Sequence, residues 1–301
     1  MDTRRVYAFT DILAEVNNGK VTIIINEPAH LVDITTFQKT PNNNLKKKVQ
    51  QLKHLISAKT DGTVQLADKD TPLRLGGGFA QIEEPNNNLL LIKRGKDTPR
   101  MPDTIDISAG LFDEAWDDPF QMMMGEALEI VRVTGNTMFY PCIIEDKKVQ
   151  KEAKTIAQAL KNEGINIEEI KQLHSYFLPL QTPIKEVRYA GTTYRGIGIA
   201  FEYETTSLEL IGLLKVPTNG IKFRYIFGET LNGKLLHNEV LSINTSTKRT
   251  EVWRMLKIER VSTLEDELKR SRGFTSKAAL IVSTLGLAST NKNNEKWEII
   301  L

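Results

Sequence analysis

Cysteine is almost absent from the chain, which has a single one, Cys142, among 301 residues. One thiol excludes an intramolecular disulfide, and it also excludes a zinc site built from a cluster of thiolates. Histidine is sparse as well and shows neither HExxH nor HxH spacing, since the four histidines stand far apart at positions 30, 54, 174 and 237. The sequence therefore predicts no zinc centre.

Long hydrophobic runs are also missing. No stretch approaches the roughly 18 uninterrupted apolar residues of a membrane helix. The N-terminal MDTRRVYAFTDILAEV lacks the basic segment, apolar run and cleavage site of a secretory signal. The formal charge of +2 gives no reason to expect nucleic acid or a membrane as partner. With 40% hydrophobic and 26% charged residues, we expect a globular, soluble, cytoplasmic protein.

The first 70 residues predict a small α/β segment in front of the main body. Lys20–Asn26 (KVTIIIN) is a β-rich run, and Leu45–Ser57 places apolar residues at helical spacing. The lysines of this predicted helix form a basic face without interleaved aromatic residues, which favours a solvated face over a nucleic-acid contact. We interpret residues 1–70 as an accessory segment, and formation of a homodimer is one role open to it.

Residues 71–301 predict the main domain, in which strands dominate. Gly76–Gly78 is not a phosphate loop, because no Gly-Lys-Ser/Thr follows and a strand comes next, so we interpret it as a tight turn. A hairpin around PNNN is expected at 79–82 and 89–93, with further strands at 137–144, 186–191, 193–204, 208–216, 221–227 and 252–261. Helices are expected at 152–163 and 166–176, as an insertion near 150–178, and at 264–271 and 276–285. This mixed order predicts an α/β fold of the α+β type and disfavours a doubly wound nucleotide fold.

The stretch Asp103–Val133 carries the main chemical signal. Asp118 is a predicted N-cap and Pro119 a predicted first helical residue. An apolar helical stripe follows at positions 120, 123, 124, 127, 128 and 131. Glu126 and Glu129 lie three residues apart on the opposite side, so their carboxylates can converge on one point.

Four acids precede this helix, at positions 113, 114, 117 and 118. Carboxylate oxygens are ligands that hard cations such as Mg²⁺ take, and crowded carboxylates repel one another unless a cation offsets them. A second interpretation stays open on spacing alone. Acids near a helix start favour the helix dipole, and glutamates on a polar helix face are commonly just solvated.

Residues 110–133 resemble the box of the Nudix hydrolase superfamily. That motif is a glycine, five residues, a glutamate, seven residues, then Arg-Glu-apolar-any-Glu-Glu-any-Gly-apolar. Glu126 and Glu129 take the places of two helix glutamates, and Asp117 takes that of the loop glutamate. The flanking GGGFAQI, NNNLLLIKRGKD and SAGLFDE resemble the strands around the box, so the resemblance covers residues 75–145.

The box departs from the family pattern at several positions. Gly125 stands where the family has an arginine that braces the loop, Ile130 replaces the last helix glutamate, and Arg132 replaces the glycine. Gly110 lies one residue too far from Asp117. The lost helix acid lowers the expected metal affinity unless another carboxylate substitutes, and the available donors are Glu202, Glu204, Glu209, Glu229 and Glu239.

The resemblance implies a mixed β-sheet sandwiched by helices and a pyrophosphohydrolase of a nucleotide or nucleotide-sugar. In that role Glu126 and Glu129 would hold Mg²⁺ or Mn²⁺, and Asp117 or an acid from a later loop would act as general base. Lys93 and Arg94, at the end of a predicted strand, would offset phosphate charge. Two alternatives stay open: a Nudix-fold nucleotide-binding or sensing module without turnover, and an unrelated α/β protein in which the box match is chance.

Overall fold

The structure is a computed structural model, and it describes most of the chain outside residues 135–176. The described residues are 5–26, 30–37, 42–96, 98, 101–128, 131–134, 177–217, 222–225, 230–231, 234–235, 237–254, 257–289 and 295–301. The predicted strand at 137–144 and the predicted helices at 152–163 and 166–176 lie outside these residues. Glu129 lies outside them too.

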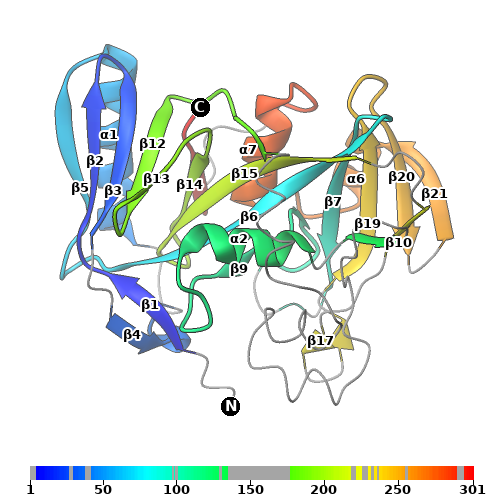
Figure 1. Ribbon diagram of the computed structural model, residues 1–301, viewed down its shortest axis with the longest axis horizontal. Helices are drawn as coiled ribbons and strands as arrows, with labels where there is room; N and C mark the ends of the chain where they lie inside the picture. The colour runs from blue at the N-terminus through cyan, green and yellow to red at the C-terminus, as the bar shows by residue number, and fades with distance from the viewer. Residues whose placement is uncertain are drawn as a thin grey trace.

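Among the described residues, thirteen strands form one large mixed sheet (Figure 1). Its main path runs through β21 (Lys257–Thr263), β20 (Arg249–Arg254), β19 (His237–Asn244), β7 (Asn88–Arg94), β6 (Leu73–Glu84), β15 (Ser207–Pro217), β14 (Gly198–Glu202) and β22 (Trp297–Ile299). The other strands of this sheet lie off the main path: β1 (Arg5–Phe9), β4 (His30–Asp33), β8 (Ile105–Asp106), β9 (Gly110–Leu111) and β11 (Phe177–Leu178). Strands β6 and β15 are parallel, whereas the other pairs are antiparallel. The mixed α/β fold predicted from the sequence is confirmed.

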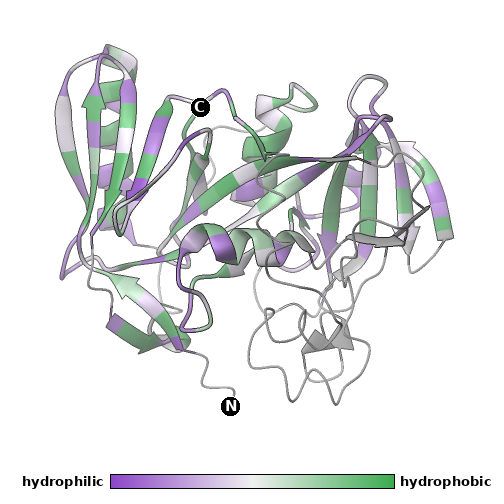
Figure 2. Cartoon of the chain, viewed as in Figure 1, coloured by the Kyte–Doolittle hydropathy of each residue, from purple (hydrophilic) through white to green (hydrophobic). Residues whose placement is uncertain are grey.

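Helices cover both faces of the large sheet. Helix α2 (Pro119–Leu128) contacts β6 and β9, and α7 (Ser276–Thr284) contacts β14 and β15. Side chains along a strand alternate between faces, so Leu90 of β7 joins the hydrophobic core that contains α2 residues, and Leu91 joins the core that contains α7 residues. A strand buried on both faces reads as a continuous apolar run, which accounts for the LLLI stretch of β7. Figure 2 shows such hydrophobic stretches along β6 and β15.

A second sheet has five strands and includes most of the N-terminal segment. Its order is β13 (Thr192–Tyr194), β12 (Ile184–Tyr189), β3 (Lys20–Ile25), β2 (Ile12–Asn17) and β5 (Gly62–Ala67). Helix α1 (Asn43–Ala58) packs against it and begins at Asn42, whose side chain accepts two backbone N–H groups of the first turn. The predicted strand and helix of this segment are confirmed. The boundary at residue 70 stays a prediction, and strands from both sides of it are hydrogen-bonded, since β12 pairs with β3 and β1 with β6.

The remaining described elements complete the chain. The 3-10 helix η1 (Ile34–Phe37) follows β4, β10 (Val131–Thr134) pairs with β16 (Lys222–Tyr225), and β17 (Thr230–Leu231) pairs with β18 (Lys234–Leu235). Helix α6 (Leu264–Lys269) begins after the N-cap Thr263, and both predicted C-terminal helices are confirmed. The β pattern at 252–261 is divided between two antiparallel strands, β20 and β21. Periodicity alone does not locate such a chain reversal. Within the described residues, no helix is long and apolar enough to cross a membrane.

The glycines at 76–78 lie inside β6, so the predicted tight turn is wrong. A Cβ at Gly76 would stand 2.4 Å from Glu209 Oε2, one at Gly77 would stand 2.3 Å from the carbonyl oxygen of Leu210, and one at Gly78 would stand 1.9 Å from that of Ser108. These distances are far below van der Waals contact. Glycine is therefore required here because neighbouring segments approach the strand closely, and not because the chain turns.

A buried ion cluster joins α7 to the sheet. Lys277 Nζ lies 3.5 Å from Glu202 Oε1 and 3.4 Å from Glu209 Oε2, and all three residues are buried. The Ser276 hydroxyl donates to Glu202 over 2.8 Å, and the Ser207 hydroxyl donates to Glu209 over 2.6 Å. Because a buried charge is costly unless it is paired and hydrogen-bonded, these residues are stable only as a set.

The two carboxyl groups of this cluster shift in opposite directions. Burial opposes ionisation of Glu202, yet the charge of Lys277 and the hydrogen bond from Ser276 outweigh it and lower its pKa to about 2. Burial raises the pKa of Glu209, and the negative charge of Glu202 raises it further. Glu202 is therefore the carboxylate that stays ionised beside Lys277.

We expect Lys277→Met to destabilise the protein by about 3–5 kcal/mol, because it removes the buried ammonium group that is paired with Glu202 and Glu209. Urea unfolding followed by circular dichroism measures this change. The matched control is Lys269→Met on α6, whose ion pair with Glu265 is exposed and is expected to contribute about 0–1 kcal/mol. Equal losses in the two variants would show that the buried cluster does not hold α7.

A pH series on Glu202→Gln tests the lowered pKa. A carboxyl group whose folded pKa lies below its unfolded value contributes stability above the unfolded pKa, and this contribution is lost as pH falls through the folded pKa. The difference in unfolding free energy between wild type and variant should therefore shrink as the pH falls from 4.5 to about 2. Glu204→Gln, which removes an exposed pair with Lys296, should leave the pH dependence unchanged. A constant difference for Glu202→Gln across this range would refute the assignment.

Candidate functional site

Helix α2 begins where the sequence predicts. The Asp118 side chain accepts the Gln121 backbone N–H over 2.9 Å, and Pro119 is the first helical residue. Phe120 and Met123, from the predicted apolar stripe, are buried in the core that α2 shares with the sheet. The helix is therefore fixed at its start by its cap and along its length by core packing.

The glycine and the first helix glutamate of the box lie in direct contact. A Cβ at Gly110 would stand 1.9 Å from Glu126 Oε1, so the carboxylate occupies the space beside the glycine backbone of β9. Glu126 is only 9% exposed. Any larger residue at position 110 would displace this carboxylate. The fold thus brings Gly110 and Glu126, which the motif assigns to one site, into contact.

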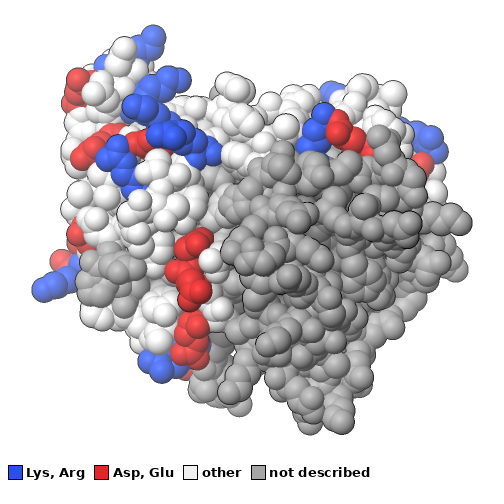
Figure 3. Space-filling model, viewed as in Figure 1, with Lys and Arg blue, Asp and Glu red and all other residues white. Residues whose placement is uncertain are grey.

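The acids of the preceding loop differ in exposure. Asp113 is buried, and its Oδ1 accepts the Ala115 N–H over 3.1 Å, so it serves the loop itself. Glu114 and Asp117 are exposed. Figure 3 shows acidic side chains gathered in one strip over this loop and the start of α2. The proposed role of Asp117 as a general base stays a prediction, and Asp117 is exposed whereas Glu126 is buried.

Lys93 and Arg94 bind acidic side chains of the protein itself. Lys93 Nζ lies 3.4 Å from Asp103 Oδ1 and donates to the carbonyl oxygen of Arg270 over 2.7 Å. The Arg94 guanidinium lies 3.0 Å from Oδ2 of the buried Asp106. Their role in binding phosphate stays a prediction, and it would compete with these internal ion pairs.

The alternative carboxylate donors have other partners. Glu202 and Glu209 bind Lys277, and α7 and α2 cover opposite faces of the sheet. Glu239 binds Arg260, and Glu204 binds Lys296, whereas Glu229 lies outside the described residues. Throughout the part of the chain that the structure describes, no three His, Cys, Asp or Glu side chains form a group that could hold a metal ion. Of the two helix glutamates matched to the box, the structure describes only Glu126, and a cation site there stays a prediction.

Trp116 packs directly against Gly125 of α2. A Cβ at Gly125 would stand 2.2 Å from Trp116 Cη2, so the indole ring from the loop lies directly on the helix backbone. An apolar contact therefore holds the loop against α2. The indole ring of Trp116 fits into the space that Gly125 leaves on the helix. The sequence signal for this contact is the coincidence of a loop tryptophan with a mid-helix glycine.

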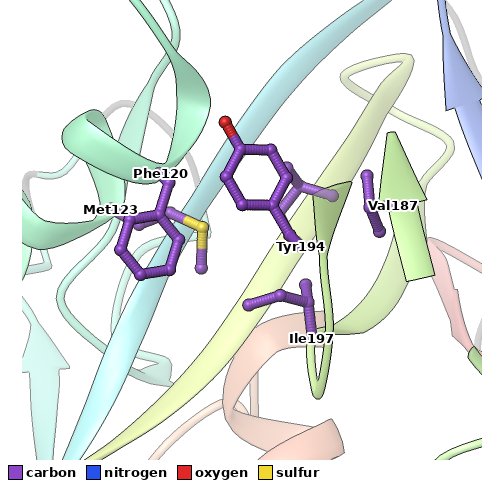
Figure 4. A pocket seen from close by; sticks show the side chains of 6 residues that line it. Phe120, Met123, Val187, Tyr194 and Ile197 are labelled. Carbon is purple, nitrogen blue, oxygen red and sulfur yellow. The ribbon is translucent and has the colours of Figure 1, made fainter. Parts of the chain in front are cut away.

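An aromatic contact joins α2 to the second sheet (Figure 4). The rings of Phe120 and Tyr194 are stacked, with centroids 5.6 Å apart and planes inclined by 2°. Burial raises the pKa of Tyr194 above its usual range, and the nearby charge of Asp118 raises it further. The hollow between these elements has no room for a water molecule, and it is lined by Phe120, Met123, Val187, Tyr194, Ile197 and Leu210. It is a packing gap rather than a ligand cavity.

We expect Gly125→Ala to destabilise the protein by about 1–3 kcal/mol, because the new methyl group overlaps the indole ring. Alanine otherwise stabilises a helix by about 1 kcal/mol relative to glycine. In a Trp116→Ala background the same change should therefore become neutral or stabilising. Urea unfolding of the four proteins gives the coupling energy between the two positions. Zero coupling would contradict the contact.

Comparisons with known proteins identify no family. No protein family model matches the chain, and no curated protein matches it. One solved structure that matches is a bifunctional NMN adenylyltransferase/ADP ribose pyrophosphatase from Francisella tularensis. The sequences are 11% identical, the TM-score is 0.31, and the match covers 83% of this chain but 50% of that one.

Proposed function

We propose that the chain is a Nudix-type hydrolase that cleaves the diphosphate of a nucleotide or nucleotide-sugar with Mg²⁺ or Mn²⁺. The contact between Gly110 and the Glu126 carboxylate carries this proposal. The motif assigns both positions to one site, and their contact supports this assignment. The cytoplasmic location and a homodimer stay predictions.

The chain's own residues would divide the work as follows. Glu126, held beside the glycine backbone of β9, would bind the cation together with Glu129. A bound divalent cation offsets phosphate charge and polarises the phosphorus toward attack. Asp117, exposed at the end of the acidic loop, would accept a proton from the attacking water. Glycine at position 110 keeps the carboxylate close to the strand, and Trp116 keeps the loop close to the helix.

Calorimetric titration of Mn²⁺ and hydrolysis of ADP-ribose test this function. Wild type should bind Mn²⁺ and release phosphate-containing products. Glu126→Gln should lower kcat/KM by at least about 100-fold, the scale of a lost acid–base or ligand group. The control Glu114→Gln, an exposed acid of the same loop, should change it less than threefold or so. Absence of both metal binding and hydrolysis in wild type would refute the proposal.

A second candidate is a nucleotide-binding module without turnover. One observation favours it: Gly125 stands at the arginine position of the motif and is covered by the Trp116 ring, which carries no charge. Such a module would bind ADP-ribose without metal, and Glu126→Gln would leave the affinity unchanged. Metal-dependent binding that is lost in Glu126→Gln would contradict this candidate.

A further inference from the structure

Two buried side chains bind the C-terminal end of α2 to the sheet region. The Gln81 side-chain amide, on β6, donates to the backbone carbonyl of Ala127. The Ser108 hydroxyl, on the segment between β8 and β9, donates to the backbone carbonyl of Glu126 over 2.5 Å. Both donors are buried. Neither has an apparent signal in the sequence, because each depends on a partner far away in the chain.

The carbonyl groups that they bind are those that a helix cannot satisfy internally. The last four carbonyls of an α-helix lack an N–H partner one turn further on. Helix α2 ends at Leu128, so the carbonyls of Glu126 and Ala127 belong to this set. A buried carbonyl without a hydrogen bond costs free energy. Gln81 and Ser108 therefore act as capping residues for α2. They lie outside the helix and donate hydrogen bonds to the carbonyls at its C-terminal end.

The two donors are themselves held in place. Gln81 is paired with Leu90 across the β6–β7 ladder. The Ser108 carbonyl lies so close to β6 that a Cβ at Gly78 would stand 1.9 Å from it. The positions of both donors are therefore set by the central strand of the sheet, and a helix bound to them can neither slide nor rotate freely.

The segment from Ser108 to Gly110 holds Glu126 at two points. Ser108 binds its backbone carbonyl, and Gly110 lies against its carboxylate. A shift of the last turn of α2 would break the first contact and move the carboxylate away from the second. The two hydrogen bonds therefore determine the position of Glu126, the described side chain that would bind the cation in the proposed site.

We propose that Gln81 and Ser108 are positioning residues that fix the last turn of α2 and thereby hold the Glu126 carboxylate against Gly110. Its consequence for turnover rests on the proposed function. The hydrogen bonds reach only the helix backbone, so neither residue touches substrate. Loss of an outer-shell partner of a metal ligand commonly lowers metal affinity or activity by about 10–100-fold, and we expect that range here.

The variants are Ser108→Ala and Gln81→Met, which remove the donors and keep side-chain bulk close to the original. Ser108→Thr keeps the hydroxyl and serves as the conservative rescue. The matched control is Thr284→Val, because the Thr284 hydroxyl donates to the Leu280 carbonyl over 2.8 Å on α7, at the other face of the sheet. Thermal unfolding identifies the temperature at which all five proteins, wild type included, are folded.

Carbodiimide labelling of carboxyl groups, read by mass spectrometry, reports the position of Glu126 without any need for activity. Labelling of Glu126 should rise several-fold in Ser108→Ala and Gln81→Met, and it should stay at the wild-type level in Ser108→Thr and Thr284→Val. Exposed Asp117 provides the internal standard, and buried Glu202 reports global opening. Unchanged Glu126 labelling in folded variants, or an equal rise at Glu202, would overturn the inference.

Mn²⁺ titration and ADP-ribose hydrolysis on the same proteins separate this inference from the proposed function. Weaker Mn²⁺ binding and a lower kcat/KM in Ser108→Ala and Gln81→Met, restored in Ser108→Thr, would support both. A wild type without Mn²⁺ binding or hydrolysis would refute the function, while the labelling result would still decide the positioning role. Normal Mn²⁺ affinity in variants with a labelled Glu126 would contradict the link between position and metal binding.

Discussion

The close approach of neighbouring segments to β6 is the constraint on which the rest of the molecule depends. At Gly76 the strand leaves room for the Glu209 carboxylate, and at Gly78 it leaves room for the Ser108 backbone. The first contact belongs to the buried cluster under α7, and the second fixes the segment that binds α2. One run of glycines therefore accommodates both the buried ion cluster and the segment that binds α2. A side chain at either position would displace a charged or hydrogen-bonded group rather than an adaptable apolar one.

Two groups of carboxylates among the described residues differ in a way that the sequence does not reveal. Glu202 and Glu267 are buried beside Lys277 and Arg260, and hydrogen bonds from neighbouring hydroxyls complete their environment. These groups stabilise the fold because each charge has a fixed partner of opposite sign. The acids before α2 instead face solvent or serve their own loop. Glu114 and Asp117 of this loop are exposed, whereas Glu202 and Glu267 are buried.

Local signals in the sequence were sufficient for the elements around the site. The β6–β7 hairpin follows from two apolar runs around an asparagine-rich turn, in which Asn87 adopts a φ of 52° that asparagine tolerates well. The start of α2 follows from the order Asp118–Pro119. The contact of Gly110 with Glu126 was not predicted, because Gly110 lies one residue too far from Asp117 for the motif spacing.

Features that depend on distant partners were not predictable in this way. The glycines of β6 were misread because a turn and a close approach both favour glycine, and only the neighbours distinguish them. Glu209 was counted as a metal donor because Lys277, its partner, lies on a helix 68 residues further along the chain. The contact of Trp116 with Gly125 was missed because an aromatic ring that packs on a glycine leaves no charge pattern in the sequence. Long-range contacts of this kind leave no periodicity in the sequence.

The apolar contact of Trp116 with Gly125 also bears on the charge of this loop. Trp116 braces the loop without adding positive charge, while Glu114 and Asp117 stay exposed on it and Arg94 is held by Asp106. A nucleotide phosphate approaching this strip would meet like charge, which disfavours binding. A divalent cation would meet opposite charge and would reverse the local field for the phosphate that follows. The exposed acids of this loop therefore attract cations and repel anions.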